Sequence, residues 1–530
     1  MSSDPPHQTA SPAHRLSLHT VLVAAGMLIS RLSGYARVTL FSHIFGLEAQ
    51  AADAFNQALR IPNFLQNLLG EGVLSASLIP VYSGLKLTDR AKADRVARAV
   101  LGVWALATSV LVLVGILWTP FIVHLLAPGF EGAILDLTIH LVRILFPGIG
   151  LLVLSAWCLA ILNSHHRFFL SYAAPVCWNA ALIFVLIRWR TDGLDALAVK
   201  LAWAAVAGSA LQLGIQVPTV WRLVTGHGTA LALNTAAAVR EVLTSTVPVI
   251  FTRGVVQVSS TIDSIIASLL PLGAITALAN ATQLYQLPVA LFGMAVSSAA
   301  LPSMSSEAAS NQADAMRTRL LAGQDTIAVL VVPSMVAFLA LGDVIVALLL
   351  EHGRFTHENT LYVWGVLAGS AVGLLATTVS RLYVSAFYAL GDTRTPTLFA
   401  VIRVLLVGLL GYMMAIWLPP LIGVPASWGT AGLTVSAGVA GWVEFALLRQ
   451  ALRRRLGDVT MPARRVAHAW VIAMAAAILA SGLRWVLPLN WPASRGIVIL
   501  GVFGTLYLAG AQLAGLLDGT AIVRRVLRRR

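Results

Sequence analysis

Long apolar runs dominate the pattern of hydrophobic and polar positions along this 530-residue chain. A run of about twenty mostly apolar residues is long enough to cross the hydrocarbon core of a bilayer as a helix. Such runs recur along the whole chain, centred near positions 30, 70, 110, 150, 178, 210, 255, 290, 335, 372, 407, 437, 475 and 507. The pattern therefore predicts an all-α polytopic membrane protein with about fourteen transmembrane helices.

The basic residues refine this interpretation. Hydrophobic residues make up 58% of the chain and charged residues 11%, yet the formal net charge is +14. Such a charge could indicate a nucleic-acid-binding protein, but most lysines and arginines fall in alternate loops and in the tail 524–530. The positive-inside rule then predicts a multi-pass protein of the bacterial inner membrane with both termini in the cytoplasm and no nucleic-acid partner.

Internal echoes predict how the helices are grouped. Residues 61–83 resemble 287–306, and 159–175 echo 386–396, in each case about 225 positions apart. Such a spacing indicates two six-helix lobes related as parallel repeats. The expected organisation is a disordered cytoplasmic tail (1–15), an N-lobe (16–224), a C-lobe (225–456), and two further helices with a basic cytoplasmic tail (457–530).

Charged residues inside the first two predicted membrane helices are candidates for function. They are Arg31, Arg37, Asp53, Arg60 and Glu71. An arginine at the bilayer centre costs roughly 2.5 to 3.5 kcal/mol on insertion scales, so we expect these side chains to face a cavity. Arginines outnumber carboxylates, and guanidinium groups pair well with phosphate oxygens, so an anionic substrate with a pyrophosphate group is favoured.

Further charges lie within the later predicted spans. Arg253 and Arg381 are candidates for the same interior, and Asp263 and Glu444 are candidates for an ion site or a charge pair. Two other arginines near helix ends are interpreted as side chains that reach the headgroups: Arg143 and Arg403.

No metal site or cofactor is expected. Cys158 and Cys177 are the only cysteines, and both fall inside predicted spans. The chain has no G-x-x-x-x-G-K-[ST] phosphate loop, so direct coupling to ATP is not expected. The membrane potential or a coupled monovalent ion would then supply the energy.

The segment 30–83 carries a resemblance to a known family. It contains, in order, S-R-x-x-G-x-x-R, I-F-G, A-D-A-F, I-P-N-x-L and E-G-x-x-S. This series resembles the lipid II flippase family (MurJ, also called MviN) of the multidrug/oligosaccharidyl-lipid/polysaccharide exporter superfamily. Weaker matches are APGF at 127–130, a segment at 287–305, HGRF at 352–355 and ALGDTRTP at 389–396.

The resemblance implies a transporter, not an enzyme. Its substrate would be the undecaprenyl-pyrophosphate-linked peptidoglycan precursor lipid II, moved across the inner membrane by alternating access, with cell-wall synthesis proteins as partners. Arg31 and Arg37 match the family's first-helix arginines, Asp53 its acidic residue and Glu71 its E-G pair. The candidate residues of a substrate-binding central cavity are Arg31, Arg37, Asp53, Arg60, Glu71, Arg253 and Gln283.

The chain also departs from the family pattern. Gln66 and Asn67 stand where an arginine pair is usual, and Thr282 and Gln283 replace an Asp-Arg pair. We hypothesise that Arg253 restores one positive charge to the cavity.

Other functions stay open at this point. A flippase for another polyprenyl-pyrophosphate-linked oligosaccharide fits the same charges, and the lost arginines would suit a non-transporting scaffold of a cell-envelope complex. A drug exporter of the same superfamily would need a carboxylate-rich cavity, which the arginine excess disfavours. A glycosyltransferase would need a large loop with acidic groups, and the longest non-helical stretch, near 222–240, has little of this.

Overall fold

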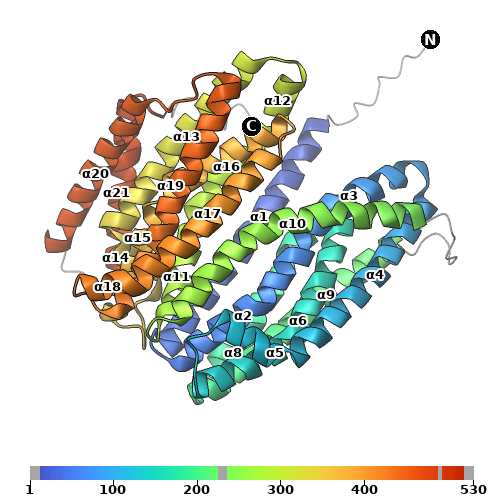
Figure 1. Cartoon of the computed structure of the whole chain (residues 1–530), viewed down its shortest axis with the longest axis horizontal. Helices are drawn as coiled ribbons and strands as arrows, with labels where there is room; N and C mark the ends of the chain where they lie inside the picture. The colour runs from blue at the N-terminus through green and yellow to red at the C-terminus, as the bar shows by residue number, and fades with distance from the viewer. Residues whose placement is uncertain (1–11, 225–235, 487–491, 518–530) are drawn as a thin grey trace, which may run out of the picture. The chain divides into compact units, whose positions relative to one another are not determined.

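The computed structural model describes residues 12–224, 236–486 and 492–517, and within these ranges all regular secondary structure is helical (Figure 1). The first helices are α1 (Pro12–Phe45), α2 (Gln50–Leu69), α3 (Glu71–Thr88), α4 (Arg90–Leu117), α5 (Thr119–Leu126), α6 (Ala133–Ser164), α7 (Phe168–Ala173), α8 (Pro175–Arg188), α9 (Leu194–Val224) and α10 (Ala236–Ser268). They are followed by α11 (Ala274–Pro288), the π-helix η2 (Val289–Met294), α12 (Ala295–Ala309), α13 (Ala313–Ala340), α14 (Gly342–Leu350), α15 (His357–Ala371), α16 (Leu374–Ala389), α17 (Arg394–Tyr412), the π-helix η3 (Met413–Trp417), α18 (Leu418–Leu421), η4 (Ala426–Trp428), α19 (Gly429–Leu456), α20 (Ala463–Val486) and α21 (Pro492–Leu513).

The helices have the length and composition of a polytopic membrane protein. Among the described residues, eleven helices are long and apolar enough to cross a membrane, or twelve if the bent pair α15 and α16 is one span. Helices α1 and α10 contain 34 and 33 residues, and at 1.5 Å per residue each is about 50 Å long, more than the bilayer core requires. The expected fourteen spans are reached only if these two helices and the bent pair are all counted as spans.

The chain divides into two compact units. Unit 1 contains Met1–Phe41, Ala58–Val123 and Leu135–Gly254, and unit 2 contains Ser42–Gln57, His124–Ile134 and Val255–Arg530. The second half of α10 therefore belongs to unit 2, together with two short pieces from the first part of the chain. The lobe boundaries expected from the sequence repeats stay a prediction.

Unit 1 is built around a core of apolar side chains from α3, α4, α6, α9 and α10. Two buried tryptophans join its helices, because the indole Nε1 of Trp104 donates to the carbonyl of Leu69 (3.2 Å) and that of Trp157 donates to the carbonyl of Ala97 (3.1 Å). The buried phenol of Tyr82 contacts His165, which follows the end of α6, at 2.9 Å. These bonds satisfy polar atoms that would otherwise be costly inside the unit.

Unit 2 contains interrupted helices. Pro288, which cannot donate a backbone hydrogen bond, immediately precedes η2, and Pro419 and Pro420 follow η3. Helices α15 and α16 meet at a bend of 42°. At the bend Gly373 lies so close to α19 that an added Cβ would be 2.4 Å from the Cα of Gly438, so the close approach requires glycine.

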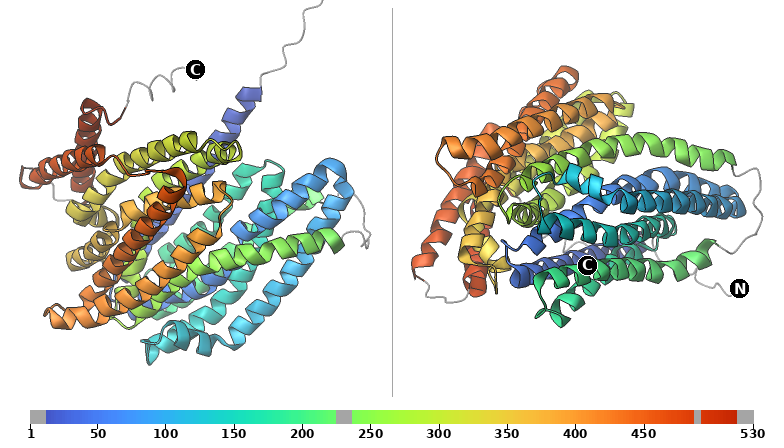
Figure 2. Two further views of the ribbon diagram at one scale, coloured as in Figure 1. Left: turned by 45° about the horizontal axis from the view of Figure 1, so that its top comes forward. Right: turned by 60° about the horizontal axis from the view of Figure 1, so that its bottom comes forward.

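The last two described helices, the red pair in Figure 2, belong to unit 2 and pack against its other helices. Arg484 forms an ion pair with Asp343 (2.8 Å), and Arg465 lies 3.0 Å from Asp325. The hydroxyl of Tyr507 donates to the carbonyl of Val329 (2.5 Å). Helices α20 and α21 are therefore tied to α13 and α14.

Candidate functional site

The arginines of α1 occupy different surroundings. Arg31 is exposed. The guanidinium of Arg37 lies 5.2 Å from the ring centroid of Trp178, and its Nε donates to Oδ1 of Asn179 (3.2 Å). The amide of Asn179 in turn donates to the hydroxyl of Ser33 (2.9 Å). Helix α8 therefore orients the Arg37 guanidinium, and its two terminal nitrogens donate to no described residue.

Asp53 has the contacts of a helix cap. It is 2% exposed. Its carboxylate accepts hydrogen bonds from the backbone N–H of Gly273 (2.8 Å) and from the backbone N–H and hydroxyl of Thr276 (2.8 and 2.6 Å). Gly273 is the N-cap residue immediately before α11, where free N–H groups favour a negative charge. Asp53 therefore stabilises the start of α11 within unit 2, and its predicted contact with substrate stays a prediction.

The other predicted cavity residues are distributed over the two units. Arg60 of unit 1 and Gln283 and Asp263 of unit 2 are all of intermediate exposure. Glu71 and Arg253 belong to α3 and α10, but their side chains lie outside the described part of the structure.

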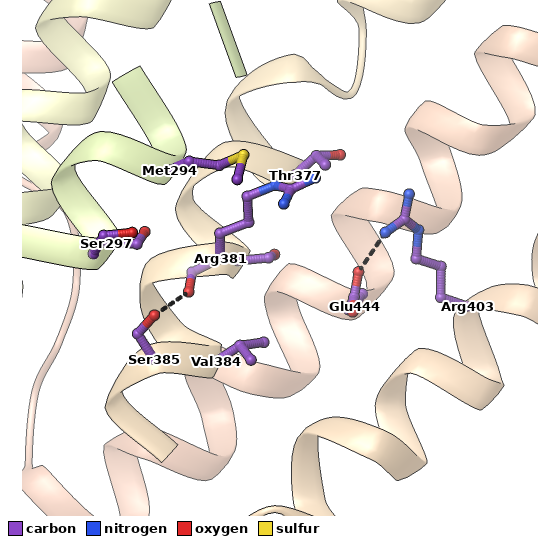
Figure 3. Close-up of a pocket in the computed structure, with 10 residues that line it drawn as sticks. Met294, Ser297, Thr377, Arg381, Val384, Ser385, Arg403 and Glu444 are labelled. Carbon is purple, nitrogen blue, oxygen red and sulfur yellow. Dashed lines mark hydrogen bonds and ion pairs between the residues drawn. The ribbon is translucent and has the colours of Figure 1, made fainter. Parts of the chain in front are cut away.

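A cavity of about 320 Å³ lies within unit 2 (Figure 3). Four helical segments contribute side chains to it: the junction of η2 and α12, together with α16, α17 and α19. The lining residues are Met294, Ser297, Ser298, Thr377, Ser380, Arg381, Val384, Ser385, Arg403 and Glu444. Two guanidinium groups, one carboxylate and five hydroxyls in a membrane helix bundle form an unusually polar lining.

The one carboxylate of this cavity is paired. Arg403 Nη1 lies 3.2 Å from Oε2 of Glu444, which is 7% exposed (Figure 3). The interpretation of Arg403 as a side chain that reaches the headgroups is wrong, because its guanidinium is held inside the bundle by this pair. The partner lies on α19, 41 positions away, and could not be identified from the neighbouring sequence.

Arg381 gives the cavity its excess charge. In Figure 3 its side chain extends from α16 toward the level of Thr377 and Met294. Within the described residues it forms no side-chain hydrogen bond or ion pair. Since Glu444 balances the charge of Arg403, one net positive charge remains in the cavity.

This charge lies deep in the unit. Arg381 is eight residues before the end of α16, Arg403 nine after the start of α17, and Glu444 twelve before the end of α19. At 1.5 Å per residue these positions are about 12 to 18 Å from the helix ends that adjoin the basic loops, close to the middle of a bilayer of about 30 Å. A cation at such a depth indicates water or a bound anion.

Some buried polar atoms of this lining also lack a protein partner in the described ranges: the hydroxyl oxygens of Ser297 and Ser380 and the Nε of Arg403. Buried polar atoms are nearly always hydrogen-bonded. Sequence reasoning singled out Arg381 and Glu444 but missed the hydroxyls. Serine and threonine in membrane helices commonly bond to their own helix backbone, so they give no distinct signal.

Comparison with known proteins places these features in context. A family model described as "Lipid II flippase MurJ" matches residues 41–508. A "Probable lipid II flippase MurJ" of Rhizobium meliloti (strain 1021) is 32% identical over 443 residues, which cover 80% of this chain and 78% of that protein. A "Lipid II flippase MurJ" of Burkholderia cenocepacia is 31% identical over 471 residues, with coverage of 87% and 88%.

Solved structures share the fold. A structure described as "Lipid II flippase MurJ, inward closed conformation" aligns with a TM-score of 0.77 at 21% identity, covering 93% of this chain and 98% of that one. An inward-facing multidrug resistance MATE family transporter of the MOP superfamily aligns with a TM-score of 0.66 at 16% identity, covering 82% and 99%.

Proposed function

This chain belongs to the MurJ family of lipid II flippases, and we propose that it carries lipid II from the cytoplasmic to the periplasmic leaflet of the bacterial inner membrane by alternating access. The observation that carries the proposal is the family match, which extends over residues 41–508 and so includes segments of both units. The chain is a multi-pass membrane transporter and not an enzyme.

Arg31 and Arg37 are the proposed contacts to the diphosphate of lipid II. Trp178 and Asn179 orient the Arg37 guanidinium, while its terminal nitrogens stay available for paired bonds to phosphate oxygens. Because the side chain is already held in one orientation, the entropic cost of ordering it on binding is lower. Arg60, Glu71, Arg253 and Gln283 are proposed as further contacts on sequence grounds.

The driving force follows from the sign of the membrane potential. The diphosphate group is negatively charged, so a potential that is negative inside favours its movement outward. Each elementary charge that crosses 100 mV contributes about 2.3 kcal/mol, enough to bias the cycle without ATP. The bend between α15 and α16 and the π-helix η2 are places where unit 2 could change shape at low cost.

The orientation of the chain and its partners are part of the same proposal. The basic residues at the end of α19, Arg453, Arg454 and Arg455, favour a cytoplasmic position for that end. Both termini are then cytoplasmic. Cell-wall synthesis proteins that use lipid II in the periplasm are the proposed protein partners.

Complementation tests this function. A strain depleted of its own lipid II flippase would express the wild-type chain, an Arg31→Ala/Arg37→Ala variant, or an Arg454→Ala variant as a control for loss of an exposed arginine. We expect growth with the wild type and the control but not with the double variant at equal membrane abundance. Failure of the wild type to expose lipid II at the periplasmic face would reject the proposal in favour of a scaffold or another lipid-linked substrate.

A further inference from the structure

We propose that the cavity of unit 2 lined by Arg381 and Arg403 is a second binding site for a phosphate oxyanion, in addition to the α1 arginines, and we assign this oxyanion to the diphosphate group of the transported lipid. This inference rests on the proposed function, because the lipid is the expected source of that group. The site is distinct in sequence and in structural unit from the α1 arginines, which belong to unit 1.

The charges of the cavity favour an anion over a cation. Glu444 is already engaged with Arg403 at 3.2 Å, so the carboxylate is not free to hold a metal ion or an ammonium group. The guanidinium of Arg381 has no hydrogen bond or ion pair among the described side chains, and it would repel any cation that entered. An anion would supply the counter-charge that Arg381 lacks.

The donor set suits a phosphate group. A guanidinium presents several N–H donors in a fixed fork that matches two phosphate oxygens. Ser297, Ser298, Thr377, Ser380 and Ser385 add hydroxyls around the same space. The hydroxyls of Ser297 and Ser380 have no partner in the described ranges, and a rotation about χ1 would direct either toward a ligand.

Size and depth are consistent with a diphosphate. A volume of about 320 Å³ corresponds to roughly ten water molecules at about 30 Å³ each. That is room for a diphosphate but not for a sugar-peptide headgroup as well, so the rest of the lipid would extend out of the cavity. The position near the middle of the helices is one that a lipid crossing the bilayer must pass.

The cavity is also bordered by two helix interruptions. Met294 is the last residue of η2, and Thr377 lies four residues beyond Gly373 at the bend between α15 and α16. A ligand that contacts both η2–α12 and α16 would therefore favour particular geometries at both interruptions. Binding in the cavity would therefore shift the conformational equilibrium of unit 2.

The experiment measures binding to the full-length chain purified in detergent. Isothermal titration calorimetry would use two probes: inorganic pyrophosphate and farnesyl diphosphate. The variants are Arg381→Gln, Arg381→Lys, and Arg454→Gln as a matched control that removes one exposed arginine of the same unit. Ser297→Ala/Ser298→Ala is a second test that leaves every charge in place.

We expect farnesyl diphosphate to bind the wild type and the Arg454→Gln control equally. Arg381→Gln should weaken binding by about tenfold or more, and Arg381→Lys by less, because lysine keeps the charge but loses the fork. Stronger binding of farnesyl diphosphate than of pyrophosphate would identify the lipid as the source. Equal binding would point to free phosphate or pyrophosphate and would overturn the assignment to the lipid.

Binding that is unchanged in Arg381→Gln and in the serine variant, or absent from the wild type, would overturn the site itself. If Arg381→Gln elutes as an aggregate, Arg381→Lys and the serine variant decide. The two proposals fail separately. A wild type that complements the depleted strain while Arg381→Gln binds normally rejects only this site. A wild type that binds the probe but does not complement, together with loss of binding in Arg381→Gln, rejects only lipid II transport.

Discussion

Breaking the Arg403–Glu444 pair should destabilise unit 2 through the carboxylate that is left behind. Arg403→Gln removes the partner that lies 3.2 Å from Oε2 of Glu444. The Glu444 side chain is 8% exposed and the Arg403 side chain 30%. The glutamate therefore has little water with which to replace the lost guanidinium.

The magnitude follows from this unequal burial. Removing one partner of a fully buried pair costs about 3 to 5 kcal/mol, whereas an exposed pair contributes about 0.2 to 1 kcal/mol. With one partner buried and the other partly exposed, we expect a loss of about 2 kcal/mol. Arg381, which borders the same cavity, offers a second positive charge and keeps the loss below the upper range.

The assay is a double-mutant cycle on the apparent melting temperature of the purified chain. It compares wild type, Arg403→Gln, Glu444→Gln and the double variant. We expect the double variant to be more stable than Arg403→Gln, because it contains no unpaired buried carboxylate. Equal destabilisation of the single Arg403→Gln variant and the double variant would refute the reasoning. It would mean that burying the unpaired carboxylate of Glu444 costs no stability.

Two further predictions concern the helix cap and the pH dependence. Asp53→Ala should lower the stability of the purified chain by about 2 kcal/mol, because the N–H groups of Gly273 and Thr276 lose a buried charged acceptor. Thermal unfolding checks this, with Glu131→Ala at an exposed position as the control. Equal melting temperatures of the two variants would contradict the prediction. Burial, together with Lys86 and Arg90, lowers the pKa of His165 to about 4. The pKa of an unfolded histidine is about 6.5, so below that pH the unfolded chain binds a proton that folded His165 does not. The stability of the folded chain is therefore highest above about pH 6.5 and falls as the pH is lowered toward about 4. The melting temperature should decline over this window and decline less in His165→Gln, and identical profiles would show that His165 makes no contribution.

The membrane helices were largely predictable because the rule that produces them is local. A bilayer requires about twenty apolar residues per span, and that requirement is visible in any single stretch of chain. The expected centre near 372 falls between α15 and α16, and the one near 290 falls at η2. Pro288 indicates the interruption near 290 locally, because proline removes a helix hydrogen bond. The bend near 372 was not predicted, because it depends on a distant neighbour, Gly438 of α19.

The candidate site was predictable only in part. Its charged members could be suspected because a charge within an apolar run is expensive, so Arg37, Arg381 and Glu444 were all candidates. Their partners could not be found in this way. Asn179 lies 142 positions from Arg37, and Glu444 lies 41 positions from Arg403.

The sequence by itself determined that this chain is an all-helical membrane protein with cations inside its spans, because apolar length and the cost of a buried charge are properties of short segments. Only the tertiary structure decided what each charge does. Asp53 caps the N-terminus of a helix 220 residues away, Arg403 pairs with Glu444, and Arg381 leaves a positive charge in a polar cavity. The physical reason is that a charge takes its role from the groups within a few ångströms, and folding chooses those groups from distant parts of the chain.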